Sequence, residues 1–268
     1  MNRCTRLPSG LDTWDKQQYQ RFRTERAAPF YDLLGLIEPA ERSRVLDLGC
    51  GTGELTALAH ERLQAADTLG IDASSNMLGS APAGVHPDLR FELCRIEDFV
   101  PSASYDVVLS NAALHWVEDH PALFERLLGW LVPGGQLAIQ MPSNERHPAH
   151  ALARRLAAEE PFSAWLTQPP RRSPLLAPAE YALLLQRLGV RKQRVRLEVY
   201  AHRLDRTSDV VEWLKGSLFT HYAAKLGERR YAEFLSAYRE RLFHELGKSA
   251  EEPYVLTYDR VFLWARRG

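Results

Sequence analysis

The chain has 268 residues, an apolar fraction of 45% and a charged fraction of 25%. These proportions are typical of a globular protein, and they exclude a disordered, collagen-like or coiled-coil chain. Thirty-four basic residues balance 34 acidic ones, which argues against a nucleic-acid binder because such proteins need a surplus of cations. No stretch reaches the roughly 18 apolar residues of a membrane span. The first residues lack the apolar core of a signal peptide, so we expect a cytoplasmic protein.

In the first half of the chain, short apolar runs bounded by turn residues alternate with helix-like segments. Expected strands lie at 43–49, 68–74, 90–94, 105–111 and 136–142, and expected helices at 54–64, 75–81 and 119–131. This alternation predicts a parallel sheet with helices on both faces. The runs are almost continuously apolar, as strands covered on both faces are.

The second half differs in charge and in pattern. Residues 146–206 hold 12 Lys and Arg against 5 Asp and Glu. An alternating strand is predicted at 195–204, helices at 208–226 and 228–246, and a strongly apolar strand at 254–267. Because the last strand is so apolar, we expect it to return to the main sheet, which makes the preceding segment an inserted cap.

A glycine-rich run follows the first strand directly and opens a helix. Asp47 is followed by Gly49, Gly51 and Gly53. Glycines at alternate positions allow positive φ and let a ligand touch the backbone, and the helix amides then face that ligand. Asp72 ends the second strand, where a carboxylate can take both hydroxyls of a ribose. The pattern therefore predicts a nucleoside-binding turn.

The spacing of this turn decides which nucleoside fits. It differs from the dinucleotide pattern G-x-G-x-x-G because Glu54 stands three residues after Gly51, and an acid there would repel a pyrophosphate. The sequence has no phosphate-binding G-x-x-x-x-G-K-[ST] loop. Asp47 suits a cationic amino group. These residues favour a ligand with a ribose and a positive end but no phosphate.

The Asp-x-Gly-x-Gly-x-Gly run and Asp72 resemble the S-adenosylmethionine site of class I methyltransferases, over residues 43–142. The resemblance implies an α/β fold, with a Rossmann-like class I methyltransferase sheet and a helical cap inserted before the last strands. It implies S-adenosyl-L-methionine as cofactor, S-adenosyl-L-homocysteine as product, and no metal. The cofactor-binding residues that it implies in this part of the chain are Asp47, Gly49, Gly51, Gly53, Asp72, Ala73, Met77, Ile96 and Asn111.

Further motifs resemble the trans-aconitate 2-methyltransferase family nearly end to end. They include Trp14-Asp15, Tyr19, Glu25-Arg26, residues 111–120, residues 140–144, residues 212–217 and Arg260-Val261-Phe262. The resemblance implies that Trp14 and Tyr19 close over the cofactor. The expected parts are a lid helix at 1–30, a Rossmann-like cofactor-binding core at 31–145, a partly helical substrate cap at 146–250 with a strand near 195–204, and a final strand at 251–268.

The resemblance also implies an acceptor site. The implied substrate-binding residues are Arg26, Trp116, His221, Tyr222 and Arg260, and the implied catalytic residues are His115 and Asn111. A carboxylate acceptor, with a pKa of about 4, is ionised at neutral pH and needs no general base. It needs positioning, for which the two-pronged guanidinium of Arg is suited. His115 would act as a base only toward a hydroxyl or an amine, and is otherwise a wall of the pocket.

Two positions depart from the family pattern. Arg95 stands where an acid usually reaches the adenine amine, which leaves that contact to the backbone of Ile96 or to Glu97 or Asp98. The run from Phe219 to Tyr222 lacks the Arg that the family usually has there, which removes one carboxylate anchor.

Three functions therefore stay open. The first is O-methylation of a carboxylate of a small organic acid such as trans-aconitate. The second is O- or N-methylation of another small metabolite, and the third is binding of S-adenosylmethionine without catalysis. We expect a monomer or weak homodimer that binds a small-molecule acceptor and neither nucleic acid nor membrane.

Overall fold

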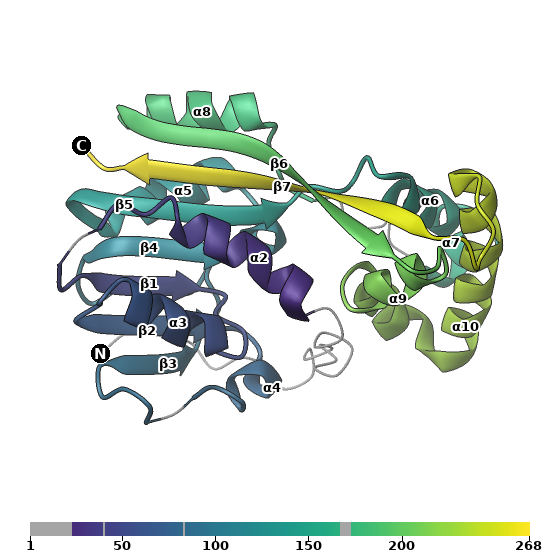
Figure 1. Ribbon diagram of the computed structural model, residues 1–268, viewed down its shortest axis with the longest axis horizontal. Helices are drawn as coiled ribbons and strands as arrows, with labels where there is room; N and C mark the ends of the chain where they lie inside the picture. Colours follow the sequence, from purple (N-terminus) through teal and green to yellow (C-terminus); the bar gives the residue numbers. More distant parts are fainter. Residues whose placement is uncertain (1–22, 40, 83, 167–172) are drawn as a thin grey trace.

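The structure, a computed structural model, describes residues 23–39, 41–82, 84–166 and 173–268, and the side chains of residues 23–26 lie outside its description. Within these ranges one seven-stranded sheet has the order β3-β2-β1-β4-β5-β7-β6 (Figure 1). The strands are β1 (Arg44–Leu48), β2 (Asp67–Asp72), β3 (Leu89–Leu93), β4 (Tyr105–Asn111), β5 (Leu131–Pro142), β6 (Lys192–Leu204) and β7 (Tyr254–Arg266).

All seven predicted strands are confirmed, with their ends shifted by a few residues. Strands β1 to β5 run parallel, whereas β7 lies antiparallel between β5 and β6. The sheet order reverses between β1 and β4, and this point of reversal opens a crevice at the carboxyl ends of the strands. The α/β fold expected from the sequence is therefore confirmed.

Helices cover both faces of this sheet and form the cap. They are α2 (Arg23–Leu34), α3 (Glu54–Arg62), α4 (Ser75–Leu78), the 3₁₀ turn η1 (Leu114–Trp116), α5 (His120–Gly129), α6 (Pro148–Ala157), α7 (Phe162–Leu166), α8 (Pro178–Arg187), α9 (Asp209–Lys215) and α10 (Leu218–Leu246). The predicted break at residue 227 is confirmed, because Gly227 interrupts α10 with φ 67° and ψ 168°. The predicted helix at 208–226 is divided at Gly216.

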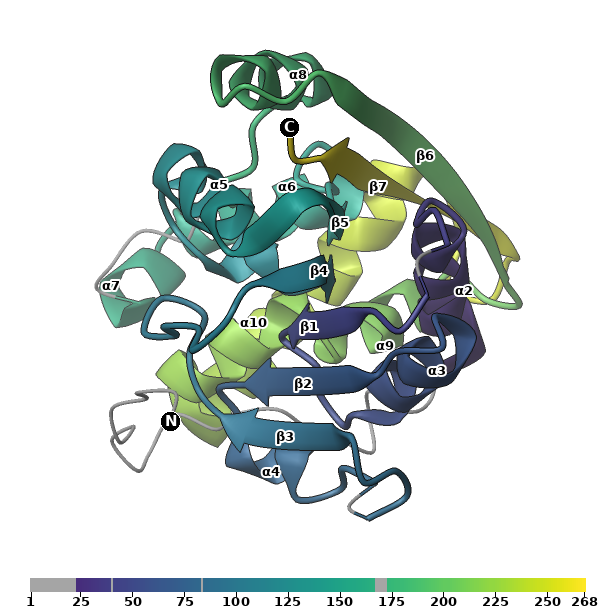
Figure 2. The same cartoon turned by 90° about the vertical axis from the view of Figure 1, so that its left-hand side faces the viewer.

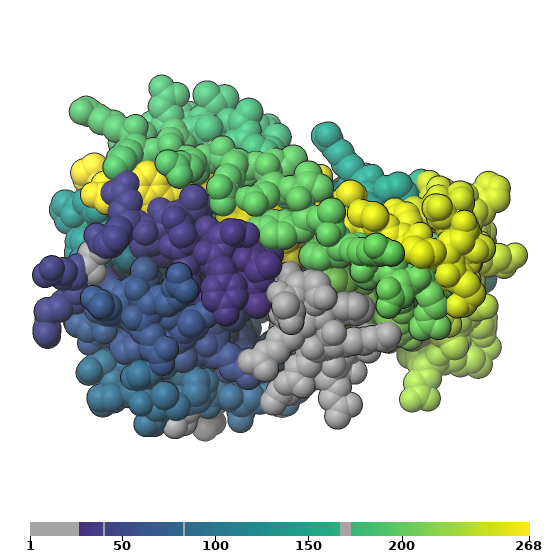
Figure 3. Space-filling model, viewed as in Figure 1, coloured from purple at the N-terminus to yellow at the C-terminus, as the bar shows by residue number. Residues whose placement is uncertain are grey.

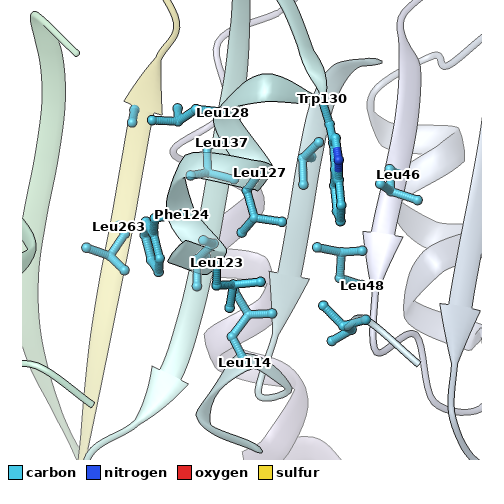
Figure 4. Packing of buried hydrophobic residues seen from close by; sticks show 14 of the residues in the cluster. Leu46, Leu48, Leu114, Leu123, Phe124, Leu127, Leu128, Trp130, Leu137 and Leu263 are labelled. Carbon is cyan, nitrogen blue, oxygen red and sulfur yellow. The ribbon is translucent and has the colours of Figure 1, made fainter. Parts of the chain in front are cut away.

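The two faces of the sheet have separate cores. Helices α5 and α8 pack on one face (Figure 2). There Leu127 belongs to the same buried cluster as Leu48 and Leu263 (Figure 4), and Leu185 of α8 belongs to it as well. Helices α2 and α3 cover the other face, where Phe30 meets the apolar side chains of β1, β4, β5 and β7. The strands are thus buried on both sides, as their almost unbroken apolar runs predicted.

Strand β6 belongs to the main sheet, and this corrects the expectation that the strand near 195–204 is part of the cap. It pairs with β7 along its whole length, from Lys192 opposite Arg266 to Leu204 opposite Tyr254. Strand β5 pairs only with residues 260–266 of β7. The far ends of β6 and β7 therefore extend past the carboxyl edge of the sheet and carry the cap (Figures 1 and 3).

The cap is built from two separate pieces of chain. Helices α6 and α7 precede β6, and helices α9 and α10 lie between β6 and β7. The four helices share a core of their own, to which the strand ends contribute Leu204, Leu256 and Tyr258. Segment 146–250 therefore contains both cap and sheet.

In the described ranges, no helix combines the length and apolarity that crossing a bilayer requires.

Candidate functional site

A cleft opens at the carboxyl ends of β1 and β4, where the strand order reverses. The empty space that it encloses, together with the open solvent at its mouth, is about 660 Å³. The lining residues come from β1, the glycine-rich turn, α2, α3, α4 and β4, and are Ala27, Phe30, Asp47, Gly49, Cys50, Gly51, Thr52, Glu54, Leu55, Met77 and Asn111.

The glycine-rich turn has the geometry that its sequence predicted. Gly49, Gly51 and Gly53 have φ values of 76°, 57° and 72°, a region that side chains disfavour. The amide of Gly49 donates to the Ile71 carbonyl at 2.8 Å and so ties the turn to β2. A Cβ on Gly53 would lie 2.6 Å from the Phe91 ring. Close packing and backbone conformation both require glycine here.

Asp72 holds this turn from the end of β2. Its Oδ2 accepts a hydrogen bond from the Gly51 amide and its Oδ1 accepts one from the Ser74 amide, both at 2.8 Å. Ser74 in turn caps α4 by accepting from the Met77 amide. Asp72 therefore shapes the turn and also lies at the position predicted to bind a ribose, a double role that the sequence did not reveal.

Asp47 lies beneath the turn and is only 3% exposed. The Thr56 hydroxyl donates to its Oδ2 at 2.6 Å. The pKa of Asp47 is raised to about 7: burial is the main cause and nearby Asp72 adds to it, while the Thr56 hydrogen bond lowers it. A buried carboxyl of this kind favours a cationic partner, because a nearby positive charge stabilises its ionised form.

The cleft is acidic. Asp47 and Glu54 line it, with Asp72 just behind the Gly51 amide, and no Lys, Arg or His is among the described lining residues. Burial, followed by the charges of Asp47 and Asp72, raises the pKa of the Cys50 thiol, which is therefore not a nucleophile. A sulfonium and an ammonium group match this lining, whereas a pyrophosphate does not.

Asn111 lines the cleft from the end of β4. The Oδ1 atom of Asn111 is buried without a hydrogen-bond partner among the described residues, which points to a ligand as its partner. His115 and Trp116 lie on the next 3₁₀ turn with their ring centroids 4.9 Å apart. His115 and Trp116 do not line the cleft described above.

The predicted adenine contacts fall into two groups. Met77 lines the cleft, whereas Ala73 is exposed next to Asp72.

Ile96 is buried after β3. Arg95, the departure from the family pattern, forms ion pairs with Glu97 and Asp98 at 2.9 and 3.9 Å. Those two acids are thus engaged by Arg95, which favours the backbone of Ile96 for the adenine contact.

The predicted acceptor residues are more scattered. Arg260 is 5% exposed, and its guanidinium lies over the rings of Tyr200 and Tyr258 at 5.5 and 5.1 Å. Tyr222 is 2% exposed and stacks on Phe234 in the cap core at 4.8 Å. The structure gives Tyr222 a packing role in place of the predicted acceptor contact. Half-buried His221 is its neighbour on α10.

Three predicted residues belong to the lid segment expected at 1–30. Trp14 and Tyr19 lie outside the described residues. Arg26 lies on α2, but its side chain is outside the described part of the chain. Two residues that the sequence reasoning missed, Ala27 and Phe30, line the cleft from the same helix. Their signal was available, because both fall within the lid segment predicted at 1–30.

Comparison with known proteins identifies the family. A methyltransferase domain model matches residues 19–193. The trans-aconitate 2-methyltransferase of Deinococcus radiodurans is 41% identical, with 95% of this chain and 98% of that protein covered. The enzyme of the same name from Sinorhizobium medicae is 35% identical, with 95% and 99% covered. The chain belongs to the trans-aconitate 2-methyltransferase family. It is an S-adenosylmethionine-dependent methyltransferase, which excludes the third open function, binding without catalysis.

Solved structures agree on the fold. YcgJ from Bacillus subtilis matches with a TM-score of 0.58 at 16% identity, covering 88% of this chain and 98% of that one. Haemonchus contortus phosphoethanolamine N-methyltransferase 2, solved with S-adenosyl-L-methionine, matches with a TM-score of 0.54 at 18% identity, covering 89% and 52%. Within the described ranges, no group of three or more His, Cys, Asp and Glu is placed to hold a metal.

Proposed function

We propose that this methyltransferase transfers a methyl group to a carboxylate of a small organic acid, with trans-aconitate as the first acid to test. The observation that carries the proposal is the similarity to enzymes named trans-aconitate 2-methyltransferase, which extends over 95% of the chain and thus includes the cap. A cytoplasmic location and a monomeric or weakly dimeric state stay predictions from the sequence.

The cleft residues divide the work of holding the cofactor. When bound, S-adenosylmethionine supplies a methyl group on a positively charged sulfur. Asp47 would face the amino group of the cofactor, Asp72 would accept from the ribose hydroxyls, and Met77 would pack against the adenine. Asn111, with its buried and unsatisfied Oδ1, would lie at the methyl end. The acidic lining supports this assignment because it favours a cationic ligand.

The proposed acceptor has to be positioned, but it does not have to lose a proton. A carboxylate is already ionised at neutral pH, so it attacks the methyl group without a general base. The approach of the carboxylate to the methyl group depends on its orientation and on partial removal of its water shell. Arg260 is the described cation suited to this task, because its guanidinium can bind a carboxylate through two hydrogen bonds. His115 then has no proton to remove from the acceptor.

The proposed reaction is tested by offering trans-aconitate and labelled S-adenosylmethionine to the protein and identifying the product by mass. At saturating donor and acceptor, we expect kcat to stay nearly constant from about pH 6 to 9, since the acceptor does not have to lose a proton. Formation of a trans-aconitate monomethyl ester supports the proposal. No methylation of this or any other carboxylic acid contradicts it.

The alternative acceptor is a hydroxyl or an amine of another small metabolite. One observation favours it: Thr220, where the family usually has an Arg, donates its hydroxyl to the Ser217 carbonyl at 2.6 Å and offers no cation to an acid. Under this alternative, His115 would remove the acceptor's proton, and kcat would fall at pH values below the pKa of that histidine. The pH profile therefore separates the two acceptors.

Affinity for S-adenosylhomocysteine should depend on the protonation of Asp47. With its pKa raised to about 7, Asp47 is largely protonated at pH 6 and cannot attract the ligand's ammonium group. We expect affinity to rise about tenfold between pH 6 and pH 8 and then to level off. Calorimetric titration at several pH values measures this. Asp47→Asn should bind weakly with little pH dependence, and an equally steep profile in that variant would refute the assignment.

A further inference from the structure

Gln140 occupies a central position beside the cleft. It lies on β5, opposite Asn111 of β4 and Phe262 of β7. Side chains directly opposite each other on neighbouring strands share a face of the sheet, and Phe262 packs on the face that α2 covers. Gln140 therefore lies next to Asn111, the residue that lines the methyl end of the cleft.

The Gln140 carboxamide is buried and unsatisfied. The residue is 0% exposed, and neither Oε1 nor Nε2 has a hydrogen-bond partner within the described part of the chain. Proteins rarely bury a carboxamide in this state unless a ligand or a water completes it. The unsatisfied Oδ1 of Asn111 is beside it, so two neighbouring amides lack partners at the same edge of the sheet.

Gln136 shows that a buried carboxamide on β5 can have hydrogen-bond partners. It lies on β5 four residues earlier, on the same face, and is 3% exposed. Its Oε1 accepts from the Glu38 amide at 2.8 Å and from Trp264 Nε1 at 2.9 Å, and its Nε2 donates to the Glu38 carbonyl at 2.8 Å. A side chain of the same type, buried on the same face, thus has hydrogen-bond partners at both Oε1 and Nε2, so their absence at Gln140 requires its own explanation.

A buried cation lies close to Gln140 on the same face. Arg260 of β7 is opposite Pro142, two residues beyond Gln140, which makes it a diagonal neighbour at about 7–8 Å between backbones. Asn111, Gln140 and Arg260 thus form a row from the methyl end of the cleft toward the cap. A small acid with two carboxylates is suited to this row, one carboxylate at the Gln140 amide and the other at the Arg260 guanidinium.

We propose that Gln140 is an acceptor-binding residue, whose Nε2 donates to the carboxylate that is methylated and holds it beside Asn111. The inference rests on the proposed function, since it requires an acid as the acceptor. Arg260 would bind the second carboxylate of that acid. It also explains why a polar side chain is kept at a fully buried position, where an apolar one of similar size would pack without cost.

The test compares Gln140→Leu with Gln136→Leu, using the first carboxylic acid that the wild-type protein methylates and trying trans-aconitate first. Gln140→Leu should raise the KM for the acid roughly 10- to 100-fold, as expected for one hydrogen bond to a charged group. The Kd for S-adenosylhomocysteine should change less than about twofold, and Tm should not fall, because the lost amide had no partner. Gln136→Leu should lower Tm and leave KM unchanged.

An unchanged KM in Gln140→Leu, with the wild-type protein active, would overturn this inference and leave the proposed function intact. A weakened cofactor affinity in place of a raised KM would also overturn it. Gln140→Met, which keeps the length of the side chain, supplies the same comparison if Gln140→Leu does not fold. A wild-type protein that methylates no carboxylic acid overturns both the inference and the function beneath it.

Discussion

Gly49→Ala is expected to destabilise the protein and to reduce S-adenosylhomocysteine affinity by more than about 100-fold. Gly49 has a φ of 76°, and a Cβ there would lie 2.2 Å from the Cβ of Ala113. The left-handed conformation costs an alanine about 1–2 kcal/mol, and overpacking adds about 1–3 kcal/mol. Relief of that overlap must separate the turn after β1 from the turn after β4. Since Gly49 and Asn111, the residue just before the turn after β4, both line the cleft, the cofactor site opens with them.

Gly84→Ala is the matched control for this variant. Gly84 also has a positive φ, 75°, but a Cβ there would meet no atom within 4 Å. Only the conformational cost of about 1–2 kcal/mol applies, and Gly84 is not among the residues that line the cleft. Thermal unfolding and calorimetric titration of both variants check the prediction. If both variants lost the same amount of Tm and kept normal affinity for S-adenosylhomocysteine, the contact with Ala113 would be unimportant.

Asp72→Asn is expected to raise the Kd for S-adenosylhomocysteine by roughly 10- to 100-fold. Removing the charge weakens the hydrogen bonds that the ribose hydroxyls would make, each worth about 1.5–3 kcal/mol when the acceptor is charged. The carboxylate also accepts from the amides of Gly51 and Ser74, and an amide side chain has one oxygen in place of two. The free energy of unfolding should therefore fall by about 1–3 kcal/mol as well.

Asp67→Asn provides the comparison from the opposite end of β2. Asp67 forms ion pairs with Arg44 and Arg90 at 3.3 and 2.7 Å. Because these pairs are partly exposed, each contributes at most about 1 kcal/mol. We expect a small loss of stability and an unchanged Kd. Affinity that drops equally in both variants would mean that Asp72 acts only through the stability of the strand.

Local sequence patterns were sufficient for most of the fold. The apolar runs at 43–49, 105–111 and 254–267 became β1, β4 and β7, because a strand buried on both faces must be apolar throughout. Gly227 interrupts α10 where the helical pattern was predicted to break. The exception was the strand near 195–204. Its alternating pattern is that of a half-covered edge strand, which the sequence alone does not distinguish from a strand in a cap.

The turn of the candidate site was equally accessible from the sequence. Glycines at alternate positions after a strand, with acids before them and at the end of the next strand, specify backbone conformation and charge together. Asp47, the three glycines, Met77 and Asn111 all line or frame the cleft. Tyr222 was misplaced because helical spacing does not indicate which face of α10 packs inside the cap.

The sequence by itself determined the order of the strands along the chain, the nucleoside-binding turn and the sign of its charge, since each depends on residues close together in the chain. Only the tertiary structure decided the raised pKa of Asp47, the double role of Asp72 and the unsatisfied amide of Gln140. Burial and hydrogen bonding at these positions depend on segments far apart in the sequence, such as α2, β4 and β7 around Gln140. Which of their atoms meet is settled only when the sheet and helices pack.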